Sequence, residues 1–156
     1  MHARGEVLKL NDGGRIAYDT YGEEDGVAVL FCHGWPSSRS MAELADDAAR
    51  KLGVRIISPD RPGIRDSTFK AERKLSEWPD VVRALLTHLR IDKVRVLAVS
   101  GGAPYAYMTG WALPENVAAI AVASGAPPIA ELTDRSGLWR LHRWMLALNA
   151  RNPALI

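Results

Sequence analysis

One stretch decides the fold of this chain: Val94-Arg95-Val96-Leu97-Ala98-Val99-Ser100-Gly101-Gly102-Ala103-Pro104-Tyr105-Ala106-Tyr107-Met108. A run of β-branched and apolar residues breaks off at Ser100 and helical spacing follows, which predicts a strand that turns sharply into a helix. Small neighbours on both sides of Ser100 are typical of a tight turn that lifts a hydroxyl clear of the sheet. A side chain much larger than methyl at position 98 or 102 would collide with this turn, and Gly101 would leave its backbone N–H open to a substrate oxygen. Taken alone, the pattern fits a helix-capping serine as well as a nucleophile.

Composition limits the classes of protein to consider. The 156 residues carry a net charge of +2 and are nearly half apolar, which predicts a globular domain with a substantial core. The charge is too close to neutral to suggest nucleic-acid binding, and no basic cluster is interleaved with aromatic residues. The single cysteine, Cys32, excludes an internal disulfide, and no spacing suits a metal, so we expect no metal, no cofactor and a cytoplasmic location. No apolar run approaches the ~18 residues of a transmembrane segment, and no signal peptide is evident.

The rest of the core is predicted to alternate strands and helices. Asn11-Asp12-Gly13-Gly14 is typical of a hairpin turn, so the chain is expected to begin with an antiparallel pair. Further strands are predicted at 27–32, 54–58 and 117–123, the first and last of them buried on both faces. Helices are predicted from Ser40, with a Ser40/Glu43 capping box, and from about Ser76. This alternation indicates a layered, mostly parallel α/β sheet with right-handed crossovers.

The pattern changes after Pro127-Pro128. A helical stripe follows, made of Leu138, Leu141, Met145 and Leu148, widened by Trp139 and Trp144, with arginines around it. A basic amphipathic helix of this kind fits either a surface for membranes or partners, or the first helix of a lid over the core. Its place directly after a core strand favours the lid, so we expect a core at 1–126 and the start of a helical lid at 127–156.

Two more loops follow predicted strands, as Ser100 does. His33-Gly34-Trp35-Pro36 follows the strand at 27–32, and Asp60-Arg61-Pro62-Gly63 follows the strand at 54–58. The carboxyl ends of parallel strands share one edge of a sheet, so these loops and Ser100 are expected to face one crevice. With this set of motifs in this order, residues 6 to about 130 resemble the α/β-hydrolase fold family, in its branch with a serine nucleophile, an HGxP loop and a DRPG turn.

The resemblance implies a strand order of 1-2-4-3-5-6 with the second strand antiparallel. It implies that Ser100 is the nucleophile and that the backbone N–H groups of Trp35 and Gly101 form the oxyanion hole. Supporting roles fall to His33, which would hold the loop by hydrogen bonds, to Asp60, which would fix its own turn, and to Gly34 and Gly102. The implied substrate is a small ester, amide or related acyl compound. Haloalkane dehalogenases and epoxide hydrolases of this fold carry aspartate at the elbow, so serine argues against both activities.

The sequence departs from the family pattern in three ways. Ala98 stands where many members have glycine, and Arg65 occupies a small-residue position near the pocket rim. The third departure concerns the base, because a serine hydroxyl needs one and the family supplies a histidine and an acid after the seventh and eighth strands. We expect this chain to end after about six strands, before both. The remaining histidines and acids (His2, His88, His142, Glu131 and Asp134) make no convincing pair, although His142 in the predicted lid is the nearest to a candidate base.

Two interpretations follow. The chain is the N-terminal part of a serine hydrolase whose catalytic histidine and acid are absent, or it is a catalytically inactive, truncated hydrolase-like protein or binding module. For the activity of this chain alone, the second is favoured. A nucleotide-binding Rossmann domain ranks behind both, since the first strand–helix junction lacks GxGxxG. The outer edge of strand 117–123 has no partner in sequence, so self-association or binding of a C-terminal complement is expected.

Overall fold

The structure, a computed structural model, describes residues 4–126 and 133–151. The chain divides into two compact units, Met1–Ala126 and Pro127–Ile156. The first unit is built around a six-stranded sheet, and the second contains one described helix. The N-terminal His2 and Glu131 lie outside the described residues.

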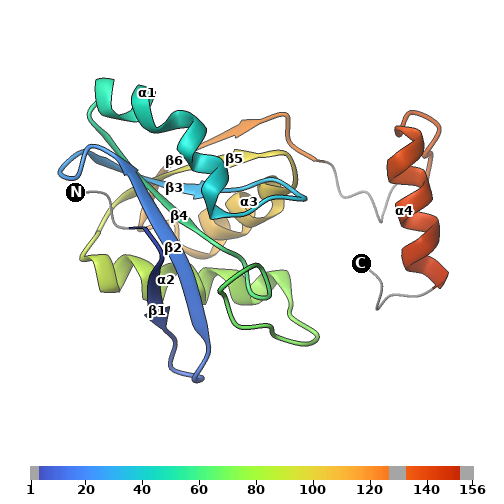
Figure 1. Cartoon of the computed structure of the whole chain (residues 1–156), viewed down its shortest axis with the longest axis horizontal. Helices are drawn as coiled ribbons and strands as arrows, with labels where there is room; N and C mark the ends of the chain where they lie inside the picture. Colours follow the sequence, from blue (N-terminus) through green and yellow to red (C-terminus); the bar gives the residue numbers. More distant parts are fainter. Residues whose placement is uncertain (1–3, 127–132, 152–156) are drawn as a thin grey trace. The chain divides into compact units, whose positions relative to one another are not determined.

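The sheet of the first unit has the order β1-β2-β4-β3-β5-β6 (Figure 1). Its strands are β1 (Glu6–Lys9), β2 (Arg15–Gly22), β3 (Val27–Cys32), β4 (Val54–Pro59), β5 (Val94–Val99) and β6 (Val117–Ala123). The β1–β2 and β2–β4 pairs are antiparallel, whereas β4–β3, β3–β5 and β5–β6 are parallel. The predicted strand order, the antiparallel second strand and the α/β fold class are therefore confirmed.

Helices cover both faces of this sheet (Figure 1). The helical elements are η1 (Arg39–Ala45), α1 (Asp46–Lys51), η2 (Leu75–Glu77), α2 (Trp78–Leu89), η3 (Ser100–Gly102) and α3 (Ala103–Ala112). The α1 helix lies on one face, and α2 and α3 lie together on the other. Each crossover between parallel strands carries one of these helices, so the strand ends that lead into the 33–36, 60–63 and 100–102 loops meet at one edge.

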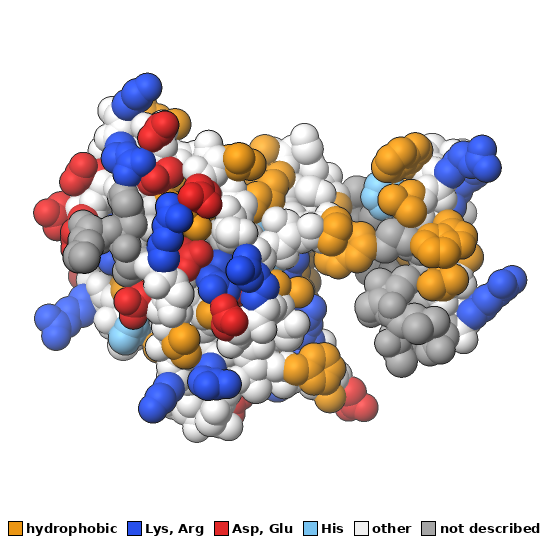
Figure 2. Space-filling model, viewed as in Figure 1, with side chains coloured by type: hydrophobic (Ala, Val, Ile, Leu, Met, Phe, Trp, Pro, Cys, Tyr) orange, Lys and Arg blue, Asp and Glu red, His pale blue; other side chains and the backbone are white. Residues whose placement is uncertain are grey.

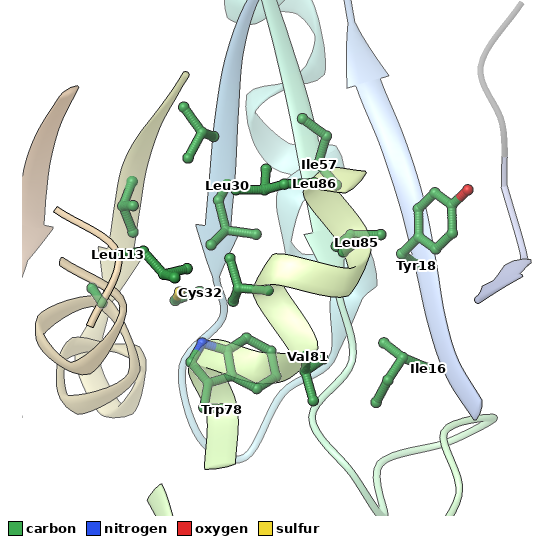
Figure 3. Close-up of a cluster of buried hydrophobic side chains, with 14 of the residues drawn as sticks. Ile16, Tyr18, Leu30, Cys32, Ile57, Trp78, Val81, Leu85, Leu86 and Leu113 are labelled. Carbon is green, nitrogen blue, oxygen red and sulfur yellow. The ribbon is translucent and has the colours of Figure 1, made fainter. Parts of the chain in front are cut away.

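The larger part of the core lies between α2 and the sheet (Figure 3). Leu85 of α2 is fully buried together with Leu30 and Ile57 of the central strands. Each such side chain contributes about 1.5–3 kcal/mol by leaving water. A smaller cluster fills the α1 face and contains Tyr21, Phe31, Ala42, Ala49 and Ile56. These two layers hold the central strands, and hence the loops at their ends, in fixed positions.

The helix predicted from Ser40 differs from the expectation. Residues 39–45 form a 3-10 helix capped at Ser38 without a side-chain capping bond, and the α-helix begins only at Asp46, so the Ser40/Glu43 capping box is wrong. The Ser38 and Ser40 hydroxyls instead bond each other at 3.0 Å. The backbone N–H of Arg39 donates to the Asp60 carboxylate, so a side chain distant in sequence caps the start of η1.

The β6 strand was expected to be buried on both faces, and this is also wrong. Residues 118–121 are all exposed. The physical reason is position, since β6 is the last strand of the sheet and α3 packs against it from one face. A continuous apolar run therefore ends the sheet with an exposed side.

The second unit contains α4 (Arg140–Arg151). Leu138 lies two residues before this helix, with its N–H bonded to the Arg135 carbonyl at 3.1 Å, so the predicted stripe begins before the helix does. Hydrophobic and basic side chains both reach the surface of this unit (Figure 2), and Trp139, Leu141 and Trp144 are among the exposed ones. None of the helices in the described ranges is long and apolar enough to cross a membrane.

Candidate active site

Ser100 occupies a sharp turn between β5 and α3. Its φ is +50°, a left-handed conformation that is unusual for a residue with a side chain and that marks stored strain at many functional sites. The Ser100 carbonyl accepts a hydrogen bond of 3.0 Å from the Ala126 N–H, which comes from the segment after β6. The predicted strand-to-helix elbow is therefore present, and it is tied to the far end of the first unit.

Glycines allow this elbow to lie against the loop after β3. A Cβ at Gly102 would lie 2.0 Å from the Cys32 carbonyl oxygen, so even a methyl group is excluded, which corrects the expectation that methyl would fit. A Cβ at Gly101 would lie 3.2 Å from the Trp35 Cβ and 3.4 Å from the Trp35 nitrogen. A Cβ at Gly34 would lie 3.4 Å from that of Ser100. The backbones of Trp35 and Gly101, the two residues predicted to donate N–H groups, thus approach each other closely beside Ser100.

The loop after β3 presents a backbone donor at this point. Among the residues that the structure describes, no hydrogen-bond acceptor contacts the Trp35 N–H. The Trp35 side chain is about half exposed, and the Trp35–Pro36 peptide bond is cis. An unoccupied N–H beside a strained serine is the arrangement that an oxyanion hole requires.

His33 is buried at the base of this loop. Its Nδ1 lies 2.9 Å from the Gly34 carbonyl oxygen, and its Nε2 has no hydrogen-bond partner among the described residues. Burial, with a smaller effect from the Arg61 charge, lowers the pKa of His33 from 6.5 to about 4. The imidazole is therefore neutral at pH 7, and its bond to Gly34 requires the proton on Nδ1. His33 holds the loop as a neutral donor.

Asp60 is fully buried and bonds outside its own turn. One carboxylate oxygen accepts the Arg39 N–H at 2.6 Å, and the other accepts a short bond from the Arg39 guanidinium. This corrects the expectation that Asp60 fixes the turn in which it lies. Asp60 joins the end of β4 to the segment that follows the loop after β3, so it positions that loop from behind.

Arg39 is a residue that the sequence analysis missed. Its guanidinium also bonds Asp19 on β2 at 3.1 Å and Asp66 at 2.7 Å. Burial alone would lower the pKa of Arg39, but the hydrogen bonds that its guanidinium donates to Asp66 and Asp60 raise this pKa above its usual value. Asp19 in turn accepts the Gly5 N–H at 2.7 Å. A buried network thus links the start of the chain to the loops of the site.

Arg61 is the second missed residue. Its guanidinium donates to the carbonyl oxygens of His33 at 2.9 Å, Gly34 at 3.0 Å and Gly101 at 3.5 Å. The guanidinium carbon also lies 4.9 Å from the centre of the Tyr105 ring. A single buried side chain therefore touches both segments that carry the predicted donors.

The other candidate residues lie elsewhere. Arg65 reaches the Ser38 and Ser40 hydroxyls at 3.4 Å each. His88 is exposed on α2, and His142 is on α4 in the second unit, with its ring 6.2 Å from that of Trp139. The remaining placements are Ala98, fully buried in the core, and Asp134, which accepts the Ser136 N–H at 2.8 Å.

The described residues also include a buried thiol and, away from Ser100, a cavity. Burial raises the pKa of Cys32 to about 12, which keeps it an unreactive thiol. A cavity of about 620 Å³ lies between the β1–β2 turn and α2, with Trp78 and Phe69 among its lining residues; Ser100 and Trp35 do not line it. Within residues 4–126 and 133–151, no group of three or more His, Cys, Asp or Glu side chains is placed to hold a metal ion.

Known proteins share sequence similarity with this chain. An uncharacterized hydrolase of Bacillus subtilis (strain 168), YcgS, is 32% identical over 117 residues, which are 75% of this chain and 40% of the relative. A non-heme chloroperoxidase of Streptomyces lividans is 30% identical over 136 residues, covering 82% of this chain and 47% of the relative. This chain thus spans less than half the length of each of these two curated relatives.

Solved structures agree on the fold. The epoxide hydrolase CorEH superposes with a TM-score of 0.76 at 23% identity, covering 99% of this chain and 58% of that one. Est816, described as an N-acyl homoserine lactone degrading enzyme, has a TM-score of 0.66 at 27% identity, covering 80% and 50%. The sequence model described as "alpha/beta hydrolase fold" matches residues 27–152. On its sheet order, its elbow and this match, the chain belongs to the alpha/beta hydrolase fold family.

Proposed function

We propose that this chain is the nucleophile-bearing, N-terminal part of a serine hydrolase that acts on a small ester, amide or related acyl compound. The observation that carries the proposal is the contact of two backbone donors beside a strained serine: the Gly101 backbone lies against Trp35, next to Ser100. Family membership alone does not give an activity, so the argument rests on this site.

The proposed reaction is acyl transfer through Ser100. Its Oγ attacks the substrate carbonyl carbon, the electron pair of the C=O bond moves to oxygen, and the N–H groups of Trp35 and Gly101 donate to that oxyanion. Each fixed donor of this kind is worth ~100-fold or more in rate. The tetrahedral intermediate expels the alcohol or amine, and water then hydrolyses the acyl-serine.

The step that this chain does not complete is removal of the Ser100 proton. His33, the histidine in the loops of the site, is neutral with its Nδ1 bonded to Gly34, and its pKa of about 4 makes it a poor base. We therefore propose that the base and its orienting acid come from polypeptide beyond these 156 residues. The shares of the relatives covered, 40% and 47%, support this, because they leave room for the second half of a hydrolase.

Several finer assignments accompany this proposal. Residues 127–156 are proposed as the start of a helical lid, because α4 exposes Leu141 and Trp144 on a helix that also carries arginines. The exposed residues 118–121 and the outer edge of β6, which pairs with no described strand, are proposed to bind either the complementing polypeptide or a second copy. A buried, free Cys32 is compatible with a reducing cytoplasm, where we propose that the protein acts.

The activities described for similar proteins support an acyl substrate. Est816 degrades N-acyl homoserine lactones, and a curated relative from Lactobacillus helveticus, 28% identical over 155 residues, is a proline iminopeptidase. The likeness to the epoxide hydrolase CorEH, at 23% identity, concerns the fold alone. Serine at position 100, rather than aspartate, favours acyl transfer over epoxide opening.

The second candidate function is a catalytically inactive hydrolase-like binding module. It is favoured by the same observation on His33, since the histidine in the loops of the site is a poor base for Ser100. Under this alternative the site binds small acyl compounds through the free Trp35 N–H without turning them over.

A chimera separates the two functions. Residues 1–156 are joined to the C-terminal part of the Bacillus subtilis relative, which lies beyond the matched region, and hydrolysis of p-nitrophenyl acetate is measured. The hydrolase proposal expects turnover in the chimera that is lost in Ser100→Ala, whereas the 156-residue chain alone gives at most ~10³-fold over water. Ser124→Ala is the matched control, because Ser124 also ends a strand with a positive φ of 49°. A folded chimera in which Ser100→Ala changes nothing would favour the binding module.

A further inference from the structure

Arg61 is buried without a carboxylate partner. Among the described residues, its nitrogens form no ion pair, and nearby Asp60 is already bonded to Arg39. The groups that surround the Arg61 charge are instead three carbonyl oxygens and the face of the Tyr105 ring. Burying a cation that has no carboxylate within hydrogen-bond distance costs stability, so this arrangement suggests a use for the charge.

The carbonyls that Arg61 touches belong to the oxyanion segments. The Gly34 oxygen, 3.0 Å from Nη2, is in the same peptide unit as the Trp35 N–H. Carbonyl and N–H point in opposite directions across a trans peptide, and a donor at the oxygen polarises the N–H at the other end. His33 Nδ1 adds a second bond to the same oxygen at 2.9 Å. The Trp35 N–H is thereby both oriented and made a stronger donor.

We propose that Arg61 is a positioning residue for oxyanion stabilisation: its guanidinium holds the Gly34 carbonyl so that the Trp35 N–H is fixed and polarised toward the substrate oxygen. The same side chain reaches the Gly101 carbonyl at 3.5 Å and so keeps the elbow at a set distance from the loop. This inference rests on the proposed function, since it assumes that an anion forms beside Ser100. The positive charge of Arg61, held in a water-poor site, also favours that anion directly.

Binding of phenylboronic acid tests the proposal without requiring turnover. The Ser100 Oγ–B bond forms, the hydroxyl proton passes to the buffer, and boron becomes a tetrahedral anion that mimics the intermediate. Tryptophan fluorescence at micromolar protein reports binding, because Trp35 lies against Gly101. Arg61→Gln removes the charge but keeps a donor, and Arg61→Lys keeps the charge without the planar fork. Arg95→Met, an exposed position at the opposite end of β5, is the control for net charge.

Arg61→Gln is expected to bind the boronate about tenfold more weakly than the wild type, since a weakened donor loses less than a deleted one. The pH midpoint at which the adduct forms should also rise by about one unit, which is the same tenfold expressed as proton affinity. Arg61→Lys should show a smaller loss, and Arg95→Met none. A merely structural role for Arg61 lowers the melting temperature but leaves the pH midpoint of the folded protein unchanged.

The outcomes are distinguishable. Wild-type affinity and midpoint in a folded Arg61→Gln overturn the role of Arg61 alone, and so do equal losses in Arg61→Gln and Arg95→Met. A wild type that binds no better than Ser100→Ala overturns both this proposal and the nucleophile assignment. If Arg61→Gln does not fold, Arg61→Lys decides, because an ammonium cannot bond two carbonyls in a fork and unchanged affinity would contradict the proposal.

Discussion

Gly102→Ala is expected to destabilise the first unit severely, because the new methyl meets backbone rather than a mobile side chain. The Cβ would lie 2.0 Å from the Cys32 oxygen, 2.7 Å from its carbonyl carbon and 2.9 Å from the His33 oxygen, against 3.4 Å or more in ordinary contact. No rotamer change relieves these contacts, so β3 and the start of α3 must separate by more than 1 Å.

The magnitude follows from this displacement. Overpacking that side chains can relieve costs 1–3 kcal/mol, so a clash with two backbone carbonyls is expected to cost about 3 kcal/mol or more. Domains of this size are stable by roughly 0.05–0.15 kcal/mol per residue, so the loss is a large fraction of the total. It corresponds to a fall in melting temperature of about 10 °C.

Thermal unfolding followed by circular dichroism measures this loss, with two matched glycine variants beside it. Gly101→Ala places its methyl 3.2 Å from the Trp35 Cβ, which a small movement relieves, so it should cost about 1 kcal/mol or less. Gly137→Ala meets nothing within 4 Å and should be neutral. If Gly102→Ala has the same melting temperature as Gly101→Ala, the close approach of the Ser100 turn to the loop after β3 is refuted.

Three further predictions follow from the site and the sheet edge. Fluorophosphonate probes should label Ser100 slowly in this chain, because labelling needs an activated alkoxide; rapid stoichiometric labelling found by mass spectrometry would contradict the missing base. The chain should self-associate in sedimentation at micromolar concentration through the free edge of β6, and a sharp monomer that binds no hydrophobic dye would refute this. His33 has a pKa of 6.5 when unfolded and about 4 when folded, so the unfolded state binds more protons between these values. The contribution of His33 to the free energy of unfolding is therefore fully present above pH 6.5. It is lost as the pH drops toward 4, by up to ~1.4 kcal/mol per pH unit. Urea unfolding across this range should show the slope, His33→Gln should lose it, and an equal slope in both would refute the neutral, buried imidazole.

Local patterns in the sequence were enough for much of the fold. The hairpin turn at 11–14 and the sharp turn at Ser100 depend on the chemistry of a few adjacent residues, and both are present. The strand order came from the family resemblance alone, and it is confirmed. Solvent exposure of β6 was not predictable from its own residues, since an apolar run has the same sequence in the middle of a sheet and at its edge.

The supporting side chains of the site escaped sequence analysis for a different reason. Arg39 bonds Asp19 and Asp60 across 20 and 21 positions, and Arg61 bonds Gly34 across 27. Contacts over such separations produce no periodic pattern in the sequence. An arginine in a loop is also a common surface residue, so its presence does not indicate burial. The one available indication is that a wholly buried aspartate in the DRPG turn demands a cation, without saying which one.

The hydrogen bond from the Ala126 N–H to the Ser100 carbonyl has a consequence for protein engineering. Ala126 is the last residue of the first unit, and Pro127 and Pro128 follow it at once. A recombination joint placed after residue 126 leaves the donor in place, so segments from relatives can be exchanged there without disturbing the serine turn. A joint one residue earlier that brings proline to position 126 deletes the N–H and loosens the elbow. A crossover that exchanges the second unit should therefore follow residue 126, or precede it only where the incoming residue at position 126 is not proline.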